Sequence, residues 1–225
     1  MLNYSNECLN HAQNKNTFHC IFTLFLIGML SPLFILISND VIAFDLDSVR
    51  RNHPNMKGKV LKSRAFIDRM GENYIYLNST GNYRSHHPSD GDVCSNIDIF
   101  AYAYRGDSYT EPTLLWKMND FVHDCIASAE CQFSEDSPII TDLNQNGIKE
   151  VWLITYLGCR GDVSPLGMKI LMYEDGKKYA LRGETFIHVD GMDLGGNYKK
   201  DQAFANGPKE FLKFADKLWN MHKNF

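Results

Sequence analysis

The chain has 225 residues, with 23 lysines and arginines against 27 aspartates and glutamates, and a formal net charge of −4 at pH 7. This balance lacks the basic excess that is typical of nucleic-acid-binding domains, so a nucleic-acid partner is not expected. About 180 residues follow an N-terminal apolar segment, and a chain of that length buries one sizeable core, which predicts a single domain.

The N-terminal segment has the pattern of an export signal. Residues 21–38 carry no charged side chain, and Val41-Ile42-Ala43 then places small or apolar residues before Phe44, as at a signal-peptide cleavage site. We therefore expect residues 1–43 to be a signal peptide and residues 44–225 to reach the periplasm or cell surface as one domain. An uncleaved anchor is the alternative, because the apolar run approaches the roughly 20 residues of a spanning helix. Membrane contact is expected only through this segment, if it stays uncleaved.

The cysteines of the exported part predict disulfides. Cys94, Cys125, Cys131 and Cys159 form an even set, and such sets in exported domains are typically paired. The short spacing between Cys125 and Cys131 favours a local bond, which leaves Cys94 to pair with Cys159. A zinc site is the alternative, but the sequence has no C-x-x-C pair to support it.

Most of the remaining chain has the alternating pattern of β-strands. Met70-Gly71 and Asp175-Gly176 are turn signals between neighbouring strands. Both faces of residues 97–105 are partly apolar. The expected strands are residues 59–68, 72–78, 97–105, 113–122, 151–157, 168–174 and 178–188.

One helix is predicted at the C-terminus. Asn206-Gly207-Pro208 is a start signal. One face of the helix then recurs at helical spacing, through Phe211, Phe214 or Ala215, Leu218 and His222. The expected fold class is mainly β within the α+β class: an antiparallel β domain with a packed C-terminal helix, stabilised by disulfides.

Residues 142–150 form the sharpest motif. Oxygen-bearing side chains stand at positions 1, 3, 5 and 9 of the loop, and Gly147 stands at the tight turn. Ca²⁺ needs such a succession of oxygens. A strand pattern follows the motif and position 12 is Leu153, so the loop is not an EF-hand. We expect weak Ca²⁺ binding by Asp142, Asn144, Asn146, the Ile148 carbonyl and Glu150. A polar turn without metal is the alternative.

Two resemblances follow from these residues. The strand-flanked D-x-N-x-N-G-x-x-E loop resembles the cation loops of FG-GAP repeats. D-L-N-x-N-G-x-x-E-V-W (142–152), C-R-G-D-V-S-P (159–165), K-I-L-M-Y-E (169–174) and K-Y-A-L-R-G (178–183) resemble a family of small secreted bacterial proteins described as surface polysaccharide biosynthesis proteins. This resemblance implies a bacterial, envelope-located protein, and it brings no catalytic residues with it.

The sequence shows no G-x-S-x-G, H-E-x-x-H or P-loop motif. His123-Asp124 adjoins Cys125, but a disulfide-bonded cysteine is not a nucleophile. We therefore expect a non-enzymatic exported binding protein, most specifically an inhibitor or immunity-type protein that binds an envelope-targeting enzyme, and hence a protein partner in the envelope. The alternative is an accessory factor or enzyme in cell-surface polysaccharide biosynthesis. Arg-Gly-Asp triplets at 105–107 and 160–162 raise host-cell adhesion as a third hypothesis.

Overall fold

A computed structural model describes residues 46–224, except residues 54, 88, 90, 108 and 109. The chain divides into two units, Met1–Ile42 and Ala43–Phe225, and every described residue belongs to the second. The predicted signal peptide and its cleavage site lie outside the described residues. Within the described part of the chain, no helix combines the length and apolar character needed to cross a membrane.

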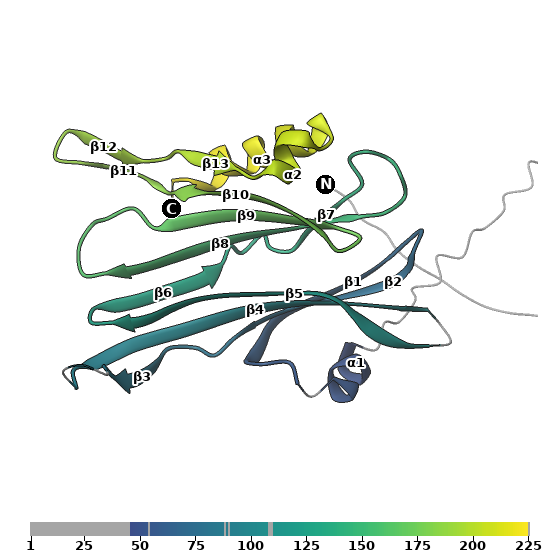
Figure 1. Cartoon of the computed structure of the whole chain (residues 1–225), viewed down its shortest axis with the longest axis horizontal. Helices are drawn as coiled ribbons and strands as arrows, with labels where there is room; N and C mark the ends of the chain where they lie inside the picture. Colours follow the sequence, from purple (N-terminus) through teal and green to yellow (C-terminus); the bar gives the residue numbers. More distant parts are fainter. Residues whose placement is uncertain (1–45, 54, 88, 90, 108–109, 225) are drawn as a thin grey trace, which may run out of the picture. The chain divides into compact units, whose positions relative to one another are not determined.

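Two antiparallel sheets pack face to face in the described unit (Figure 1). The first sheet has the order β1-β2-β4-β5, and β3 continues beside β4 beyond the end of β2. This architecture confirms the predicted antiparallel, mainly β fold. The strands of the first sheet are β1 (Lys59–Asp68), β2 (Gly71–Ser79), β3 (Tyr83–His86), β4 (Val93–Asp107) and β5 (Thr110–Cys125).

The second sheet has the order β13-β10-β9-β8, and β6 and β7 follow one another along the far edge of β8. A separate hairpin of β11 (Phe186–Val189) and β12 (Met192–Gly195) replaces the last part of the long strand predicted over 178–188. The strands of the second sheet are β6 (Ser128–Phe133), β7 (Ile139–Thr141), β8 (Glu150–Arg160), β9 (Gly167–Glu174), β10 (Lys177–Glu184) and β13 (Tyr198–Lys200).

Helices cover the outer face of each sheet. α1 (Leu46–Asn52) packs against the first sheet, and α2 (Gln202–Asn206) and α3 (Lys209–His222) pack against the second (Figure 1). The predicted C-terminal helix is confirmed as α3, and its apolar stripe is buried. The core between α3 and the second sheet contains Phe211, Ala215, Leu218 and Trp219 from the helix, and Trp152, Ile154 and Met172 from the strands.

Strand alternation explains why the central strands are apolar on both faces. In β2 and β4, Ile75, Leu77 and Ile99 face the second sheet, whereas Tyr76 and Tyr102 lie on the opposite face, in the cluster beside α1. The partly apolar character of both faces of residues 97–105 is thus explained, since successive side chains in a strand point to opposite faces.

The predicted disulfide pairing is wrong. Cys125, at the end of β5, is bonded to Cys159 on β8 and so joins the two sheets, while Cys94 and Cys131 are buried thiols. The β6–β8 register pairs Cys131 with Leu157, and Ala129 with Cys159. Cys131 therefore lies two residues away from the bond, in the core between the sheets, where burial raises the pKa of its thiol to about 12.

Candidate functional site

The predicted cation loop connects β7 to β8, and its own hydrogen bonds close it. The side chains at the first, third and fifth positions of the loop each accept a hydrogen bond from a backbone N–H within it. These bonds are Gly147 N–H to Asp142 Oδ1 (3.4 Å), Asn146 N–H to Asn144 Oδ1 (3.1 Å) and Ile148 N–H to Asn146 Oδ1 (2.7 Å). Gly147 has a positive φ of 78°, which glycine adopts without steric cost. The loop therefore keeps its shape through protein contacts.

Glu150, the last predicted ligand, lies buried at the base of this loop. Its carboxylate accepts the Thr141 hydroxyl at 2.6 Å and the Leu143 N–H at 3.0 Å, and both of its oxygens have a protein donor. Burial raises the pKa of Glu150, and the nearby Glu174 adds to that rise, while the bonds from Thr141 and Leu143 oppose it.

Glu174, at the end of β9, is a site residue that sequence reasoning missed. Its Oε1 accepts the amide Nδ2 of Asn144 at 2.6 Å and that of Asn146 at 2.9 Å. The pairing of β8 with β9 could have revealed it. Val151 pairs with Tyr173, so Glu174 lies directly across from Glu150.

Two of the side chains that were predicted to bind Ca²⁺ are already hydrogen-bonded within the protein. The side-chain oxygens of Asn144 and Asn146 accept backbone N–H groups, and their amide nitrogens donate to Glu174. Among residues 46–224, apart from the gaps stated above, no group of three or more His, Cys, Asp and Glu side chains is arranged to hold a metal ion. Ca²⁺ binding by the loop stays a prediction.

The same loop connects the two sheets. Arg69 N–H donates to the Gly147 carbonyl at 2.7 Å, and Lys149 N–H donates to Asp68 Oδ2 at 3.3 Å. Arg105 of β4 pairs with Asp68, at 3.8 Å, and with Asp175 in the β9–β10 turn. We call this region, residues 68–69, 105, 142–150 and 174–175, the loop end.

The arginines of both Arg-Gly-Asp triplets form ion pairs within the protein. Arg105 belongs to the loop end, and Arg160 pairs with Glu130 at 3.0 Å. Neither contact supports a role in adhesion.

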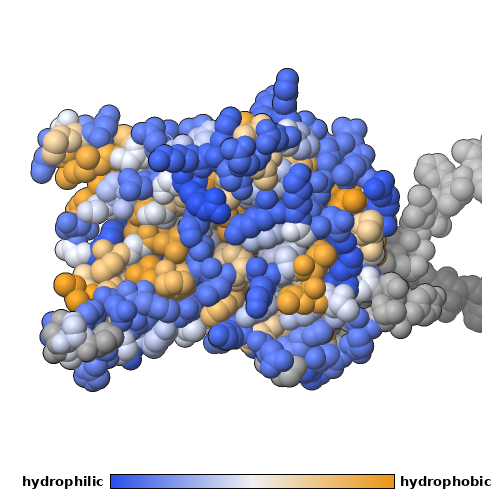
Figure 2. Space-filling view, in the orientation of Figure 1, coloured by the Kyte–Doolittle hydropathy of each residue, from blue (hydrophilic) through white to orange (hydrophobic). Residues whose placement is uncertain are grey.

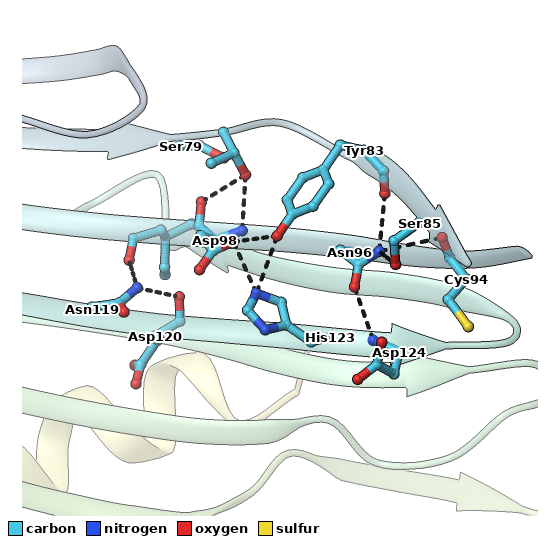
Figure 3. A network of polar contacts seen from close by, with 12 residues as sticks. Ser79, Tyr83, Ser85, Cys94, Asn96, Asp98, Asn119, Asp120, His123 and Asp124 are labelled. Atoms are coloured by element: carbon cyan, nitrogen blue, oxygen red, sulfur yellow. Dashed lines mark hydrogen bonds and ion pairs between the residues drawn. The ribbon is translucent and has the colours of Figure 1, made fainter. Parts of the chain in front are cut away.

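The opposite end of the sandwich carries the Cys125–Cys159 bond, β3 and the β5–β6 turn, and we call it the disulfide end. A polar network lies on the outer face of the first sheet here (Figure 3). Asp98 Oδ2 accepts the Tyr83 hydroxyl at 3.0 Å and lies 2.9 Å from His123 Nε2. Burial acts to raise the pKa of Asp98, but the hydrogen bonds from His123 and Tyr83 outweigh it and lower that pKa.

Sequence reasoning missed this network, although Asp98 stands out as an acid in an otherwise apolar strand. His123 contacts Asp98 rather than its neighbour Asp124, whose N–H donates to Asn96. The Phe121 ring stacks on His123 with ring centroids 4.4 Å apart, and Phe121 is 53% exposed. The network therefore fixes aromatic side chains on the surface without burying them.

Two adjoining grooves lie at the disulfide end. Their volumes are about 500 and 570 Å³, and Asn82 and Ser128 line both. Figure 2 shows apolar side chains gathered at this end, around β6 and the β5–β6 turn. Exposed large apolar side chains lie in or beside the grooves, and we define them as the apolar patch: Leu61, Tyr83, Val93, Phe121 and Ile126.

A serine, a histidine and an aspartate also meet at the end of α3. Ser134 Oγ lies 3.4 Å from His222 Nδ1, and Asp136 Oδ2 lies 3.2 Å from His222 Nε2. The first distance exceeds the reach of about 2.6–3.2 Å that is typical of an activated nucleophile. The serine oxygen also accepts the Asp136 N–H. These contacts hold α3 against the β6–β7 connection.

The chain matches no protein-family model, and searches of curated proteins and of solved structures gave no match.

Proposed function

We propose that this chain is an exported, non-enzymatic protein that binds a protein partner in the cell envelope through the apolar patch, as an inhibitor or immunity-type protein does. One observation carries the proposal. Large apolar side chains are exposed together at the disulfide end, with Ile126 at 79% and Leu61 at 60%. A contiguous apolar surface with a polar rim is typical of a protein-interaction site, and buried aromatic anchors dominate the energy of such interfaces.

The rigidity of the disulfide end supports the same function. Tyr83 and Phe121 stand on strands and are oriented by His123 and Asp98, and the disulfide fixes the neighbouring strand ends. Side chains that are already ordered lose little conformational entropy on binding, which favours affinity. The two grooves give a partner's side chains places to insert.

The polysaccharide accessory function is the second candidate, and one observation favours it. The half-exposed Phe121 ring lies beside the polar groups of His123 and Asp98. Such a flat apolar surface next to hydrogen-bonding groups also suits the two chemical faces of a sugar ring.

Site-specific photo-cross-linking tests the proposal. The full chain, with p-benzoylphenylalanine in place of Ile126, is produced in its native cells and irradiated, and the matched control carries the same group in place of Lys217, an exposed residue of α3. We expect one discrete protein adduct from position 126 and none from position 217. Excess purified wild-type protein should compete the adduct away, whereas the Phe121→Ser variant should compete poorly.

The absence of an adduct at position 126, or equal adducts at both positions, would contradict the proposal. Loss of the adduct on adding purified surface glycan, with no effect of purified wild-type protein, would favour the polysaccharide function.

A further inference from the structure

Three cationic side chains lie on the inner face of the second sheet. Lys169 lies on β9, and Lys178 and Arg182 lie on β10; the register pairs Arg182 with Lys169, and Lys178 with Tyr173. Leu171 and Ala180 stand two positions away from these residues, on the same face of their strands, and they are buried in the core between the sheets. All three cations therefore belong to the face that the first sheet covers, yet Lys178 and Arg182 remain exposed.

A buried hydroxyl accompanies these cations. Tyr173 is 3% exposed, and its ring stacks on Trp116 with centroids 3.9 Å apart and an interplanar angle of 8°. Within the described residues, the Tyr173 hydroxyl has no hydrogen-bond partner. A buried polar group without a partner is energetically unfavourable, so this hydroxyl indicates a group that the protein itself does not supply.

The cations differ in how they are neutralised. Lys169 Nζ lies 2.6 Å from Asp120 Oδ1, and Thr155 donates to the other oxygen of that carboxylate. No carboxylate of the described residues forms an ion pair with Lys178 or Arg182. Partial loss of solvent around Lys178 lowers its pKa, the neighbouring Arg182 lowers it further, and Asp120 opposes both effects. An anion at this position would relieve the repulsion between the two cations.

We propose that the Tyr173 hydroxyl, Lys178 and Arg182 form a binding site for a phosphate group. The Lys178 ammonium lies 5.8 Å from the centre of the Tyr173 ring, so the lysine and the tyrosine share one part of the sheet. A guanidinium can bond two oxygens of an oxyanion, and an ammonium and a hydroxyl can bond the others. Four oxygens match this donor set better than the two of a carboxylate.

The surroundings leave room for a larger molecule that carries the phosphate. Arg182 also lines a groove of about 500 Å³, together with Glu184, Asn197 and Lys199. Inorganic phosphate and a phosphate monoester are thus both compatible with the site. The site is independent of the apolar patch, so it does not rest on the proposed protein partner.

Calorimetric titration of the full chain with inorganic phosphate at constant ionic strength tests the site. We expect saturable binding that the Tyr173→Phe variant weakens about tenfold, because it loses one charge-assisted hydrogen bond while keeping the ring on Trp116. Arg182→Gln should lower the affinity at least as much. Arg160→Gln is the matched control, since Arg160 already pairs with Glu130, and it should bind as the wild type does.

A wild-type titration without binding, or equal affinities of the Tyr173→Phe, Arg182→Gln and wild-type proteins, would overturn the proposal. Urea unfolding of each variant shows whether the fold is kept, and Tyr173→Phe removes only one oxygen. A second titration with glycerol 2-phosphate shows whether the site prefers a phosphate monoester or free phosphate. Tighter binding than that of inorganic phosphate supports a site for phosphate monoesters, and equal or weaker binding supports a site for free phosphate.

Discussion

The two ends of the sandwich hold the same two sheets together by different means. At the loop end, Arg105 bridges Asp68 and Asp175, and backbone groups of residues 147 and 149 bond to the β1–β2 turn. At the disulfide end, the Cys125–Cys159 bond connects β5 to β8 directly. One end is closed by a set of polar contacts, and the other by a covalent bond.

This difference has a consequence for the surface. Polar side chains at the loop end are occupied by contacts with each other, and Asp68 has a side-chain exposure of only 1%. A covalent bond needs only two side chains, so the neighbouring surface is left for other contacts. Val93 and Ile126 are more than half exposed there. The disulfide end therefore combines a fixed backbone with an accessible apolar surface.

The largest expected effect is removal of the disulfide. The bond spans 34 residues, and the chain-entropy relation for a closed loop of that size gives a contribution of about 4 kcal/mol. The Cys125→Ser, Cys159→Ser double variant should lose about that much free energy of unfolding, measured by urea denaturation. Peptide mapping of the unreduced protein should find Cys125 linked to Cys159. A Cys125–Cys131 linked peptide would show that the pairing described here is wrong.

Arg105→Ala should have the next largest effect. It leaves the Asp68 carboxylate buried without its cation and removes a hydrogen bond to Asn73, so we expect a loss of about 3 kcal/mol in urea unfolding. The matched control is Arg160→Ala, whose ion pair with Glu130 is more exposed and should contribute about 0.5 kcal/mol. Equal losses of unfolding free energy in the two variants would mean that Arg105 does not hold the two sheets together at the loop end.

Calcium is expected to act more weakly. At the predicted affinity of about 10⁻⁴–10⁻³ M, Ca²⁺ at ten times its Kd should add about 1.4 kcal/mol to stability by mass action. The melting temperature should then rise in millimolar Ca²⁺ and not in Na⁺ of equal ionic strength. Asp142→Ala should abolish the rise. A wild-type melting temperature that ignores Ca²⁺ would show that loop 142–150 works through its protein contacts alone.

The smallest effect concerns the pH dependence of stability. Burial raises the pKa of Glu150 above its ordinary value of 4.5, so the folded state binds this proton more tightly than the unfolded chain does. Its stabilising contribution is present below the unfolded pKa and is lost as pH rises through the folded pKa. Urea midpoints from about pH 4 to pH 7 should therefore fall more for the wild type than for Glu150→Gln. Parallel profiles would contradict the raised pKa.

The sequence predicted most of the fold, because the alternation of apolar and polar residues and the positions of turn residues are visible within each short stretch of sequence. The strand over residues 59–68 has the predicted bounds, and the strand predicted over residues 97–105 lies within β4. The C-terminal helix followed from its apolar spacing. Short elements were missed, among them α1 and β3, since seven or four residues carry too little periodicity to be recognised.

The candidate site was less predictable because it depends on contacts between distant residues. The spacing of Cys125 and Cys131 suggested a local bond, but the bond joins Cys125 at the end of β5 to Cys159 on β8, in the other sheet. Glu174 joins the loop only through the pairing of β8 with β9. Asp98 meets His123 across two neighbouring strands and 25 positions of sequence. None of these partners is visible from local spacing.

Hydrogen–deuterium exchange, followed by mass spectrometry, tests most directly whether the disulfide and the Arg105 contacts each stabilise their own end of the sandwich independently. The Cys125→Ser, Cys159→Ser variant should exchange faster than the wild type near residues 122–125 and 157–160, with no change in residues 142–150. Arg105→Ala should show the reverse pattern. If either variant accelerated exchange equally at both ends, the two clamps would not be independent and the account of the disulfide end as a separately fixed binding surface would be wrong.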